Sequence, residues 1–241
     1  TFTDPLVECK ECKGRFRADK IDTSKCPNCG KENTFGEPRQ FNMMFETVVG
    51  PNSMAVLNKN VSSIDEGTIR IEKYPFDKPI SLDTYSYNQL AYLRPETAQG
   101  IFTNYKNVVD TIYPDLPFGL AQIGKAFRNE ISPRDFIFRV RELEQMEIEY
   151  FVDEKTWEAE FEKWRQAVHA WLDTLGLDKS KVHELPVEGD DLAHYSKRTI
   201  DFEYDYTIGR EELLGLAYRT SFDLDNIERV SGKDMKYTVK G

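Results

Sequence analysis

Hydrophobic residues recur at helical spacing in two parts of the chain, residues 90–112 and 153–176. This pattern predicts two amphipathic helices. The first would carry Glu96 in its first turn, where a carboxylate is favoured by the helix dipole. The second would begin at Asp153 as N-cap and end at Gly176.

Alternating patterns predict strands around these helices. Residues 127–147 hold two strand candidates joined by a loop at 131–135, and the second candidate runs from about 136 to 152. Side chains in a strand alternate between its faces, so Arg128 and Glu130 should point the same way. Other strand candidates are the buried-looking segment 41–49, the alternating segment 68–74 and the segment 200–208, whereas 76–88 is typical of a loop.

The second strand candidate presents an unusual order of charges on its odd-numbered positions. Arg139 and Arg141 come first, and Glu147 and Glu149 follow. Such a face can hold an anion at one end and a cation at the other. The alternative is a solvated sheet face whose Arg–Glu pairs contribute only a fraction of a kcal/mol.

All four cysteines fall near the start of the chain as two Cys-x-x-Cys pairs, Cys9 with Cys12 and Cys26 with Cys29. Four thiolates suit the closed tetrahedral coordination of structural Zn²⁺, which leaves no open position for catalysis. The clustering favours this metal site, in a reducing compartment, over two disulfides or free thiols. The site would either contact nucleic acid or stabilise a small insert.

The composition limits the classes of partner. Acidic residues outnumber basic ones by 42 to 32 among 241 residues, which gives a net charge of −10. Proteins that bind nucleic acid nonspecifically are usually basic, so a nucleic acid would have to meet a local basic patch. No apolar run approaches the ~20 residues that span a bilayer, and no signal peptide is recognisable. We therefore expect a cytoplasmic protein without a membrane partner.

Phrases along most of the chain resemble homodimeric glycyl-tRNA synthetases, a family of class II aminoacyl-tRNA synthetases. FRNE at 127–130 and RVRELEQMEIEYF at 139–151 resemble motif 2 of that class. Further similar phrases are DPLVECK at 4–10, EPRQFNMMF at 37–45, LRPETAQGIF at 93–102, LAHYSKRTIDFEY at 192–204 and EELLGLAYRTSFDL at 211–224.

The resemblance implies an α+β fold, a class II synthetase-like antiparallel sheet flanked by helices, with a small zinc-ribbon insert. The implied parts are a zinc-ribbon-like insert (1–36), the catalytic core with motif 2 (37–152), a helical segment (153–190) and the core continued (191–241). The implied activity is ATP-dependent ligation of glycine to tRNA(Gly) through glycyl-adenylate. ATP, Mg²⁺ and structural Zn²⁺ would be the cofactors, and the protein would be a homodimer.

Site residues follow from the resemblance position by position. Arg128 and Glu130 would be catalytic, Arg128 on the ATP α-phosphate and Glu130 at the adenosine end. The implied ATP-binding residues are Arg128, Asn129, Glu130, Phe138, Arg139, Val140, Arg141, Glu142, Leu143, Glu212 and Leu213. The implied glycine-binding residues are Glu96, Leu143, Glu144, Gln145, Met146 and Glu147. The aromatic residue beneath the adenine would be Phe138 or Phe136.

Departures from the family pattern leave alternatives open. The chain opens mid-phrase without methionine, the family's motif 1 should precede Thr1, and motif 3 and the anticodon-binding domain should follow Gly241. We therefore expect a fragment that is not a full catalyst by itself. The residues 52–88 also look longer than expected. The alternatives are a catalytically inactive synthetase-like tRNA-binding or regulatory module, and a zinc-ribbon nucleic-acid-binding protein without catalysis.

Overall fold

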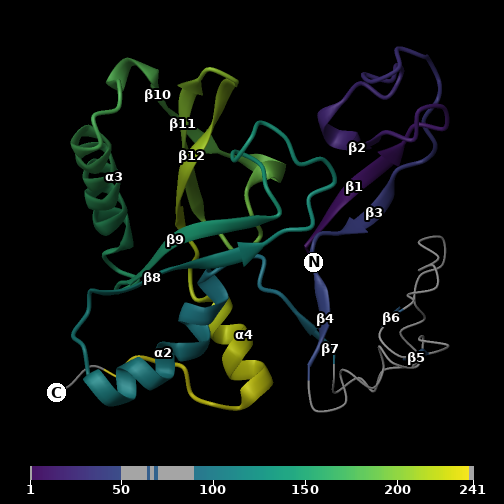
Figure 1. Ribbon diagram of the computed structural model, residues 1–241. Helices are drawn as coiled ribbons and strands as arrows, with labels where there is room; N and C mark the ends of the chain where they lie inside the picture. The colour runs from purple at the N-terminus through teal and green to yellow at the C-terminus, as the bar shows by residue number, and fades with distance from the viewer. Residues whose placement is uncertain (1, 50–63, 66–67, 70–89, 239–241) are drawn as a thin grey trace. The chain divides into compact units, whose positions relative to one another are not determined.

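The computed structural model describes residues 2–49, 64–65, 68–69 and 90–238 and shows a mixed α+β protein (Figure 1). The chain divides into two compact units. Unit 1 comprises Thr1–Glu96 and Lys125–Glu144, and unit 2 comprises Thr97–Gly124 and Gln145–Gly241. Each strand pair whose register is given for the described residues is antiparallel. The expected α+β fold class with antiparallel sheets is therefore confirmed.

Unit 1 begins with a three-stranded antiparallel sheet in the order β2-β1-β3. Its strands are β1 (Thr3–Glu8), β2 (Arg15–Arg17) and β3 (Arg39–Asn42), and the 3-10 helix η1 (Ala18–Lys20) follows β2. Leu6 and Val7 of the central strand are each 1% exposed. The sheet therefore has a small apolar centre beside the first cysteine pair.

The expected buried strand at 41–49 is divided. β3 ends at Asn42, and β4 (Glu46–Val48) pairs separately with β7 (Leu90–Tyr92). The Asn42 side chain accepts a hydrogen bond from the Met44 N–H at 3.0 Å. Such a local turn competes with the strand backbone, so a continuous strand was the wrong prediction.

Only part of the segment 68–74 can be compared with its prediction. β5 (Ile64–Asp65) pairs with β6 (Thr68–Ile69), so the alternating segment starts as a strand. Residues 70–89, including the predicted loop at 76–88, lie outside the described residues.

Unit 2 contains the first predicted helix, α2 (Ala98–Ile112). Its buried side chains are Ala98, Ile101, Phe102 and Tyr105. Phe102 and Tyr105 both pack on Phe151, and Tyr105 also stacks on Phe118; the ring centroids of Tyr105 and Phe151 are 4.7 Å apart. The helix starts later than predicted, because Thr97 is its N-cap. Glu96 therefore precedes the helix and does not lie in its first turn.

The second predicted helix, α3 (Trp157–Thr174), packs on a three-stranded sheet in the order β10-β11-β12 (Figure 1). The strands are β10 (Val182–Val187), β11 (Arg198–Tyr206) and β12 (Gly209–Tyr218), with the 3-10 helices η4 (Lys179–Lys181) and η5 (Gly189–Asp191) before and after β10. The shared core consists of Trp157, Phe161, Leu172, Ile200 and Phe202.

The ends of α3 show one correct and one wrong prediction. Gly176 has φ +71° directly after the C-cap Leu175, as predicted for a glycine at this position. Asp153 is not the N-cap, because Thr156 occupies that place. Asp153 instead accepts a hydrogen bond from the Lys155 N–H at 2.8 Å, which forms a turn before the helix.

The strands β8 (Phe118–Phe127) and β9 (Glu142–Phe151) form a two-stranded sheet, and the loop between them contains residues 128–141. The helix α4 (Phe222–Ser231) follows β12. Within β9 the odd residues from Leu143 to Glu149 are less exposed than the even residues, which confirms one shared face. Helices in the described ranges lack the length and hydrophobicity needed to cross a membrane.

The strands of motif 2 are shorter than predicted. β8 ends at Phe127 and β9 begins at Glu142, so Arg128, Glu130, Arg139 and Arg141 lie outside the strands. Asp135 and Phe136 have φ of +58° and +56°, which an extended strand cannot contain. The prediction that Arg139 and Arg141 share a strand face with Glu147 and Glu149 is therefore wrong, because the two arginines do not lie in a strand.

Candidate active site

Arg128 and Glu130 line an open cleft of about 280 Å³ within unit 1. The wall combines the end of β8, the loop after it and the first strands of the chain. Its lining residues are Phe2, Thr3, Asp4, Arg17, Met43, Arg128, Glu130 and Arg139. Three guanidinium groups and two carboxylates make this cleft strongly polar, which suits a charged ligand.

The position of Arg128 is fixed from both its main chain and its side chain. Its N–H donates to the Arg141 carbonyl at 2.9 Å, and its Nε donates to the Pro95 carbonyl at 3.0 Å. The guanidinium also lies 5.5 Å from the centre of the Phe2 ring. A guanidinium fixed through Nε can still donate from its two terminal nitrogens, which match the oxygens of a phosphate.

Glu130 is 5% exposed, although its side chain is a carboxylate. Arg139 Nη1 lies 3.8 Å from Glu130 Oε1, and Arg141 Nη2 donates to the Glu130 carbonyl at 3.2 Å. The arginines of the loop thus fold back on Glu130. Arg139 is thus the arginine next to the carboxylate, and Arg141 holds the main chain of the same residue.

The two aromatic candidates of the loop differ in exposure. Phe136 is 91% exposed, whereas Phe138 is partly buried and its N–H donates to the Asp135 carbonyl at 3.0 Å. Of the two, only Phe138 is held within the loop rather than exposed to solvent.

The four cysteines converge in unit 1, with their Sγ atoms all within 4.8 Å of one another. Cys9 and Cys29 Sγ are 3.8 Å apart, and Cys12 and Cys26 Sγ are 3.7 Å apart. A tetrahedral ion with Zn–S bonds of about 2.3 Å requires S–S edges of about 3.8 Å. These residues therefore fit a tetrahedral thiolate-bound metal ion.

Both cysteine pairs use the same backbone turn. The Lys13 N–H donates to the Cys9 carbonyl and the Gly30 N–H to the Cys26 carbonyl, each at 2.9 Å. Lys13 and Gly30 both have positive φ, of 58° and 71°. The Thr34 hydroxyl, 3.2 Å from Cys9 Sγ, is the main cause that lowers the pKa of Cys9 to about 6. Desolvation and the neighbouring thiols raise the pKa of Cys29 to about 11 instead, so thiolate is favoured at Cys9 and not at every position of the cluster.

In unit 2, two polar residues of the predicted glycine site meet one buried threonine. Thr97 Oγ1 lies 2.9 Å from Glu147 Oε2 and 3.2 Å from Gln145 Oε1, and the Thr97 N–H donates to Gln145 Oε1 at 3.0 Å. Thr97 is 0% exposed. No role was predicted for Thr97 from the sequence.

Glu212 and Leu213 lie on β12, a strand that was not predicted. β11 pairs Glu203 with Glu212 but Phe202 with Leu214, so Leu213 is the extra residue of a β-bulge. Bulges redirect side chains and are common next to active sites.

A polar cluster around Arg219 in unit 2 was also not predicted from the sequence. Arg219 is paired with Asp223 at 2.9 Å, its guanidinium lies 3.9 Å from the centre of the Tyr195 ring, and Gln99 Nε2 donates to Asp223 at 3.1 Å. Asp223 is only 9% exposed. The spacing of four residues between Arg219 and Asp223 was the available signal.

Comparison with known protein families shows which family the chain belongs to. The family model described as tRNA synthetase class II core domain (G, H, P, S and T) matches residues 83–230, more than half of the chain. The chain belongs to the class II tRNA synthetase core family.

Relatives of this class II core are named "Glycine--tRNA ligase". The protein of Treponema denticola is 41% identical over 241 residues, which cover 98% of this chain and 46% of that protein. The proteins of Malacoplasma penetrans and Streptomyces coelicolor are 42% and 39% identical, each over 98% of this chain and 49% of its own length. The chain spans about half the length of the curated relatives it matches.

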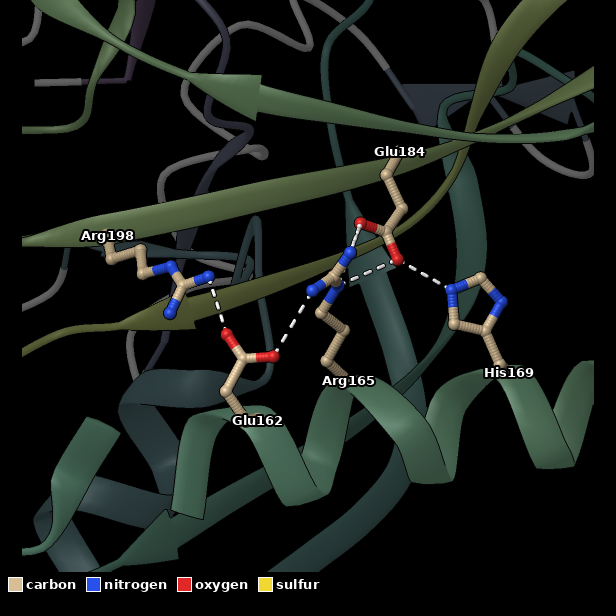
Figure 2. Close-up of polar contacts among 5 residues, drawn as sticks. All are labelled: Glu162, Arg165, His169, Glu184 and Arg198. Atoms are coloured by element: carbon tan, nitrogen blue, oxygen red, sulfur yellow. Dashed lines mark hydrogen bonds and ion pairs between the residues drawn. The ribbon is translucent and has the colours of Figure 1, made fainter. Parts of the chain in front are cut away.

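A charged network within the class II core joins α3 to the sheet beside it (Figure 2). Glu184 of β10 accepts from Arg165 Nε at 2.8 Å and contacts His169 Nε2 at 2.6 Å. Glu162 bridges Arg165, at 3.2 Å, and Arg198 of β11, at 2.7 Å. Arg165 is the main cause that lowers the pKa of Glu184, with a smaller contribution from His169.

We expect Glu184→Gln to lower the free energy of unfolding by about 1 kcal/mol at neutral pH, because Arg165 and His169 lose their shared anion. A lowered pKa stabilises the fold above the unfolded-state value of about 4.3 and loses this effect as pH falls through the folded-state value. Urea unfolding should therefore show the difference at pH 7 and a decreasing difference as the pH falls below about 4. Asp173→Asn, which removes an exposed pair with Lys179 on the same helix, is the control. Equal losses in both variants would contradict a special role for the network.

Proposed function

We propose that the protein ligates glycine to tRNA(Gly) with ATP, through a glycyl-adenylate intermediate. The observation that carries the proposal is the Arg128–Glu130 cleft in a chain whose relatives at about 40% identity are named glycine–tRNA ligases. A catalytically inactive tRNA-binding or regulatory module would not require a fixed arginine or a buried glutamate facing the same cleft.

In the proposed first step, the glycine carboxylate attacks the α-phosphorus of ATP, and pyrophosphate leaves. Arg128 binds the α-phosphate, and Glu130 contacts the adenosine end, with Phe138 as the ring beside the adenine. Asn129, Arg139, Val140, Arg141, Glu142 and Leu143 complete the motif 2 part of the ATP site. Positioning and charge neutralisation lower the barrier, and bound Mg²⁺ would neutralise further phosphate charge.

The remaining proposed site residues would bind glycine, or contact ATP from β12. Glu96 and Glu147 are the carboxylates proposed to bind the glycine ammonium, and Leu143, Glu144, Gln145 and Met146 line the same site. Selecting glycine requires excluding every larger side chain, which a crowded pocket achieves sterically. Glu212 and Leu213 are proposed to contact ATP, and the β-bulge at Leu213 supports a functional position.

The proposals on location, oligomeric state, metal and domain division rest on the same similarity to glycine–tRNA ligases. We propose a cytoplasmic homodimer that uses structural Zn²⁺, with residues 1–36 as a zinc-ribbon-like insert, 37–152 and 191–241 as catalytic core and 153–190 as a helical segment. Sedimentation of the intact protein, at concentrations spanning its proposed dimerisation, measures the dimer directly.

Transfer of labelled glycine tests the proposed reaction. The intact protein, incubated with ATP, Mg²⁺, radiolabelled glycine and tRNA(Gly), should form acid-precipitable label that is released by mild base, as an ester is. Omitting ATP should prevent this label. A folded protein that forms no glycyl-tRNA would refute the proposed function.

The metal proposal has a separate test. We expect one zinc per chain, and Cys26→Ser should release it and lower the melting temperature strongly, because binding energy of a structural zinc stabilises the fold. Elemental analysis and thermal unfolding of the intact protein measure both effects. Ser24→Ala, in the same segment, should keep the zinc. A metal-free purified protein that is as stable as the zinc-loaded form would contradict the site.

A further inference from the structure

Thr97 occupies a position where its side chain has two possible uses. It is the N-cap of α2, and threonine at this position commonly accepts a hydrogen bond from the first turn of the helix. The Thr97 side chain makes no such cap hydrogen bond. Its hydroxyl instead contacts Glu147 and Gln145 of β9, although it is fully buried at 0% exposure.

We propose that Thr97 is a positioning residue that orients the Glu147 carboxylate toward the ammonium group of glycine. The proposal deepens the proposed function and rests on it. Thr97 itself would not contact glycine. It would act through Glu147, by holding one carboxylate oxygen so that the other is directed to the ligand.

The acceptors around Thr97 determine where its single hydroxyl hydrogen goes. The Thr97 N–H donates to Gln145 Oε1 at 3.0 Å, which places the amide oxygen of Gln145, an acceptor only, toward Thr97. The hydroxyl hydrogen can then go to Gln145 Oε1 at 3.2 Å or to Glu147 Oε2 at 2.9 Å. The carboxylate is the shorter and stronger acceptor, because the bond is charge-assisted.

The main chain of Thr97 is held as firmly as its side chain. Gln122 of β8 donates to the Thr97 carbonyl through Nε2, and the Gly100 N–H donates to the same carbonyl at 3.2 Å. A Cβ at Gly100 would lie 3.3 Å from Gln122 Nε2, so the glycine allows this close approach. Thr97 is therefore fixed to β8 and to β9, and little freedom remains for its hydroxyl.

A fixed donor matters more for glycine than for other amino acids. Glycine has no side chain, so the ammonium and the carboxylate are the groups by which it can be oriented. A carboxylate that rotates would hold the ammonium in several positions, and misplacing reacting groups by small distances costs rate and affinity. Orientation of Glu147 should therefore affect glycine and leave ATP nearly unaffected.

The test compares Thr97→Val, which has nearly the same shape without a hydroxyl, with Thr97→Ser, which keeps the hydroxyl, in glycine-dependent pyrophosphate–ATP exchange by the intact protein. We expect Thr97→Val to raise KM for glycine about 10-fold, with KM for ATP within twofold of wild type. Thr97→Ser should restore KM for glycine to within about threefold. Thr103→Val, which removes a hydroxyl bonded to the Gln99 and Gly100 carbonyls of α2, should change neither constant.

A double variant separates orientation from stability. If Thr97 acts through Glu147, adding Thr97→Val to Glu147→Gln should raise KM for glycine no further than Glu147→Gln does alone. Thr97→Ala, which keeps the main-chain contact to Gln145, replaces Thr97→Val in the same measurements if the valine variant does not fold.

The outcomes also separate this proposal from the proposed function. An unchanged KM for glycine in Thr97→Val or Thr97→Ala, while Glu147→Gln raises it, overturns the role of Thr97 alone. Equal rises in KM for glycine and ATP, or additive effects in the double variant, also overturn it. A wild-type protein without glycine-dependent exchange overturns the proposed function itself.

Discussion

Arg128→Ala should reduce glycine-dependent pyrophosphate–ATP exchange by on the order of 10³-fold, the largest functional effect we expect of any single change. The charge of the α-phosphate rises as the new bond forms, and alanine removes the guanidinium proposed to neutralise it. The structure allows this loss without unfolding, because the main-chain bond from Arg128 to Arg141 remains. The measurement is kcat/KM for ATP, with thermal unfolding on the same sample.

Two further variants test whether the loss of exchange comes from the missing guanidinium group of Arg128. Arg128→Lys keeps a positive charge but loses the planar fork, so it should recover only a small part of the activity. Arg134→Ala removes an exposed arginine that pairs with its neighbour Asp135 at 3.2 Å, and it should exchange at the wild-type rate. If Arg128→Ala exchanges like Arg134→Ala, Arg128 has no phosphate role.

Glu147→Gln should raise KM for glycine by about 10- to 100-fold, because a hydrogen bond to a charged group contributes about 1.5–3 kcal/mol. Glutamine keeps the size of the side chain. The change therefore removes the negative charge with little change in packing. Exchange measured over a range of glycine concentrations at saturating ATP gives the expected rise.

The same samples provide the comparison for ATP. KM for ATP should change by less than threefold in Glu147→Gln, since the proposed role of Glu147 concerns the ammonium alone. Glu154→Gln, an exposed acid in the turn after β9, removes the same charge a short distance along the chain and should leave both constants unchanged. Equal rises for glycine and ATP would assign Glu147 to a different part of the site.

Local patterns predicted the elements that local chemistry specifies. The spacing of the cysteine pairs predicted a four-thiolate cluster, and the structure brings all four Sγ atoms within 4.8 Å. The apolar spacing of α2 and α3 and the alternation of β9 were also readable, because burial of one face imposes these periods. Gly176 could be placed because a positive φ favours glycine.

Features that depend on distant contacts were not readable. Arg128 and Glu130 were assigned to a strand, but a loop returns Arg139 and Arg141 to Glu130 and ends the strand at Phe127. Thr97 showed no signal, since its partners Gln145 and Glu147 lie about 50 positions further along the chain. The bulge at Leu213 depends on pairing with β11, which no local pattern encodes.

The role of the motif 2 residues came from resemblance and not from periodicity. Charge order on a presumed strand left a solvated sheet face as an equal alternative. The cleft now adds a physical reason, because Glu130 is 5% exposed beside three arginines. A nearly buried glutamate with an arginine 3.8 Å from its carboxylate is uncommon on an ordinary solvated sheet face, which favours a binding role for the cleft.

Pyrophosphate–ATP exchange by the intact protein, with glycine, alanine or no amino acid, tests the central claim most directly. The account predicts rapid exchange with glycine and at least about 100-fold slower exchange with alanine, because one added methyl group must be excluded sterically. Exchange should fall to background without an amino acid. A folded protein that exchanges equally with alanine, or not at all with glycine, would contradict the claim that this chain contributes to a glycine-activating site.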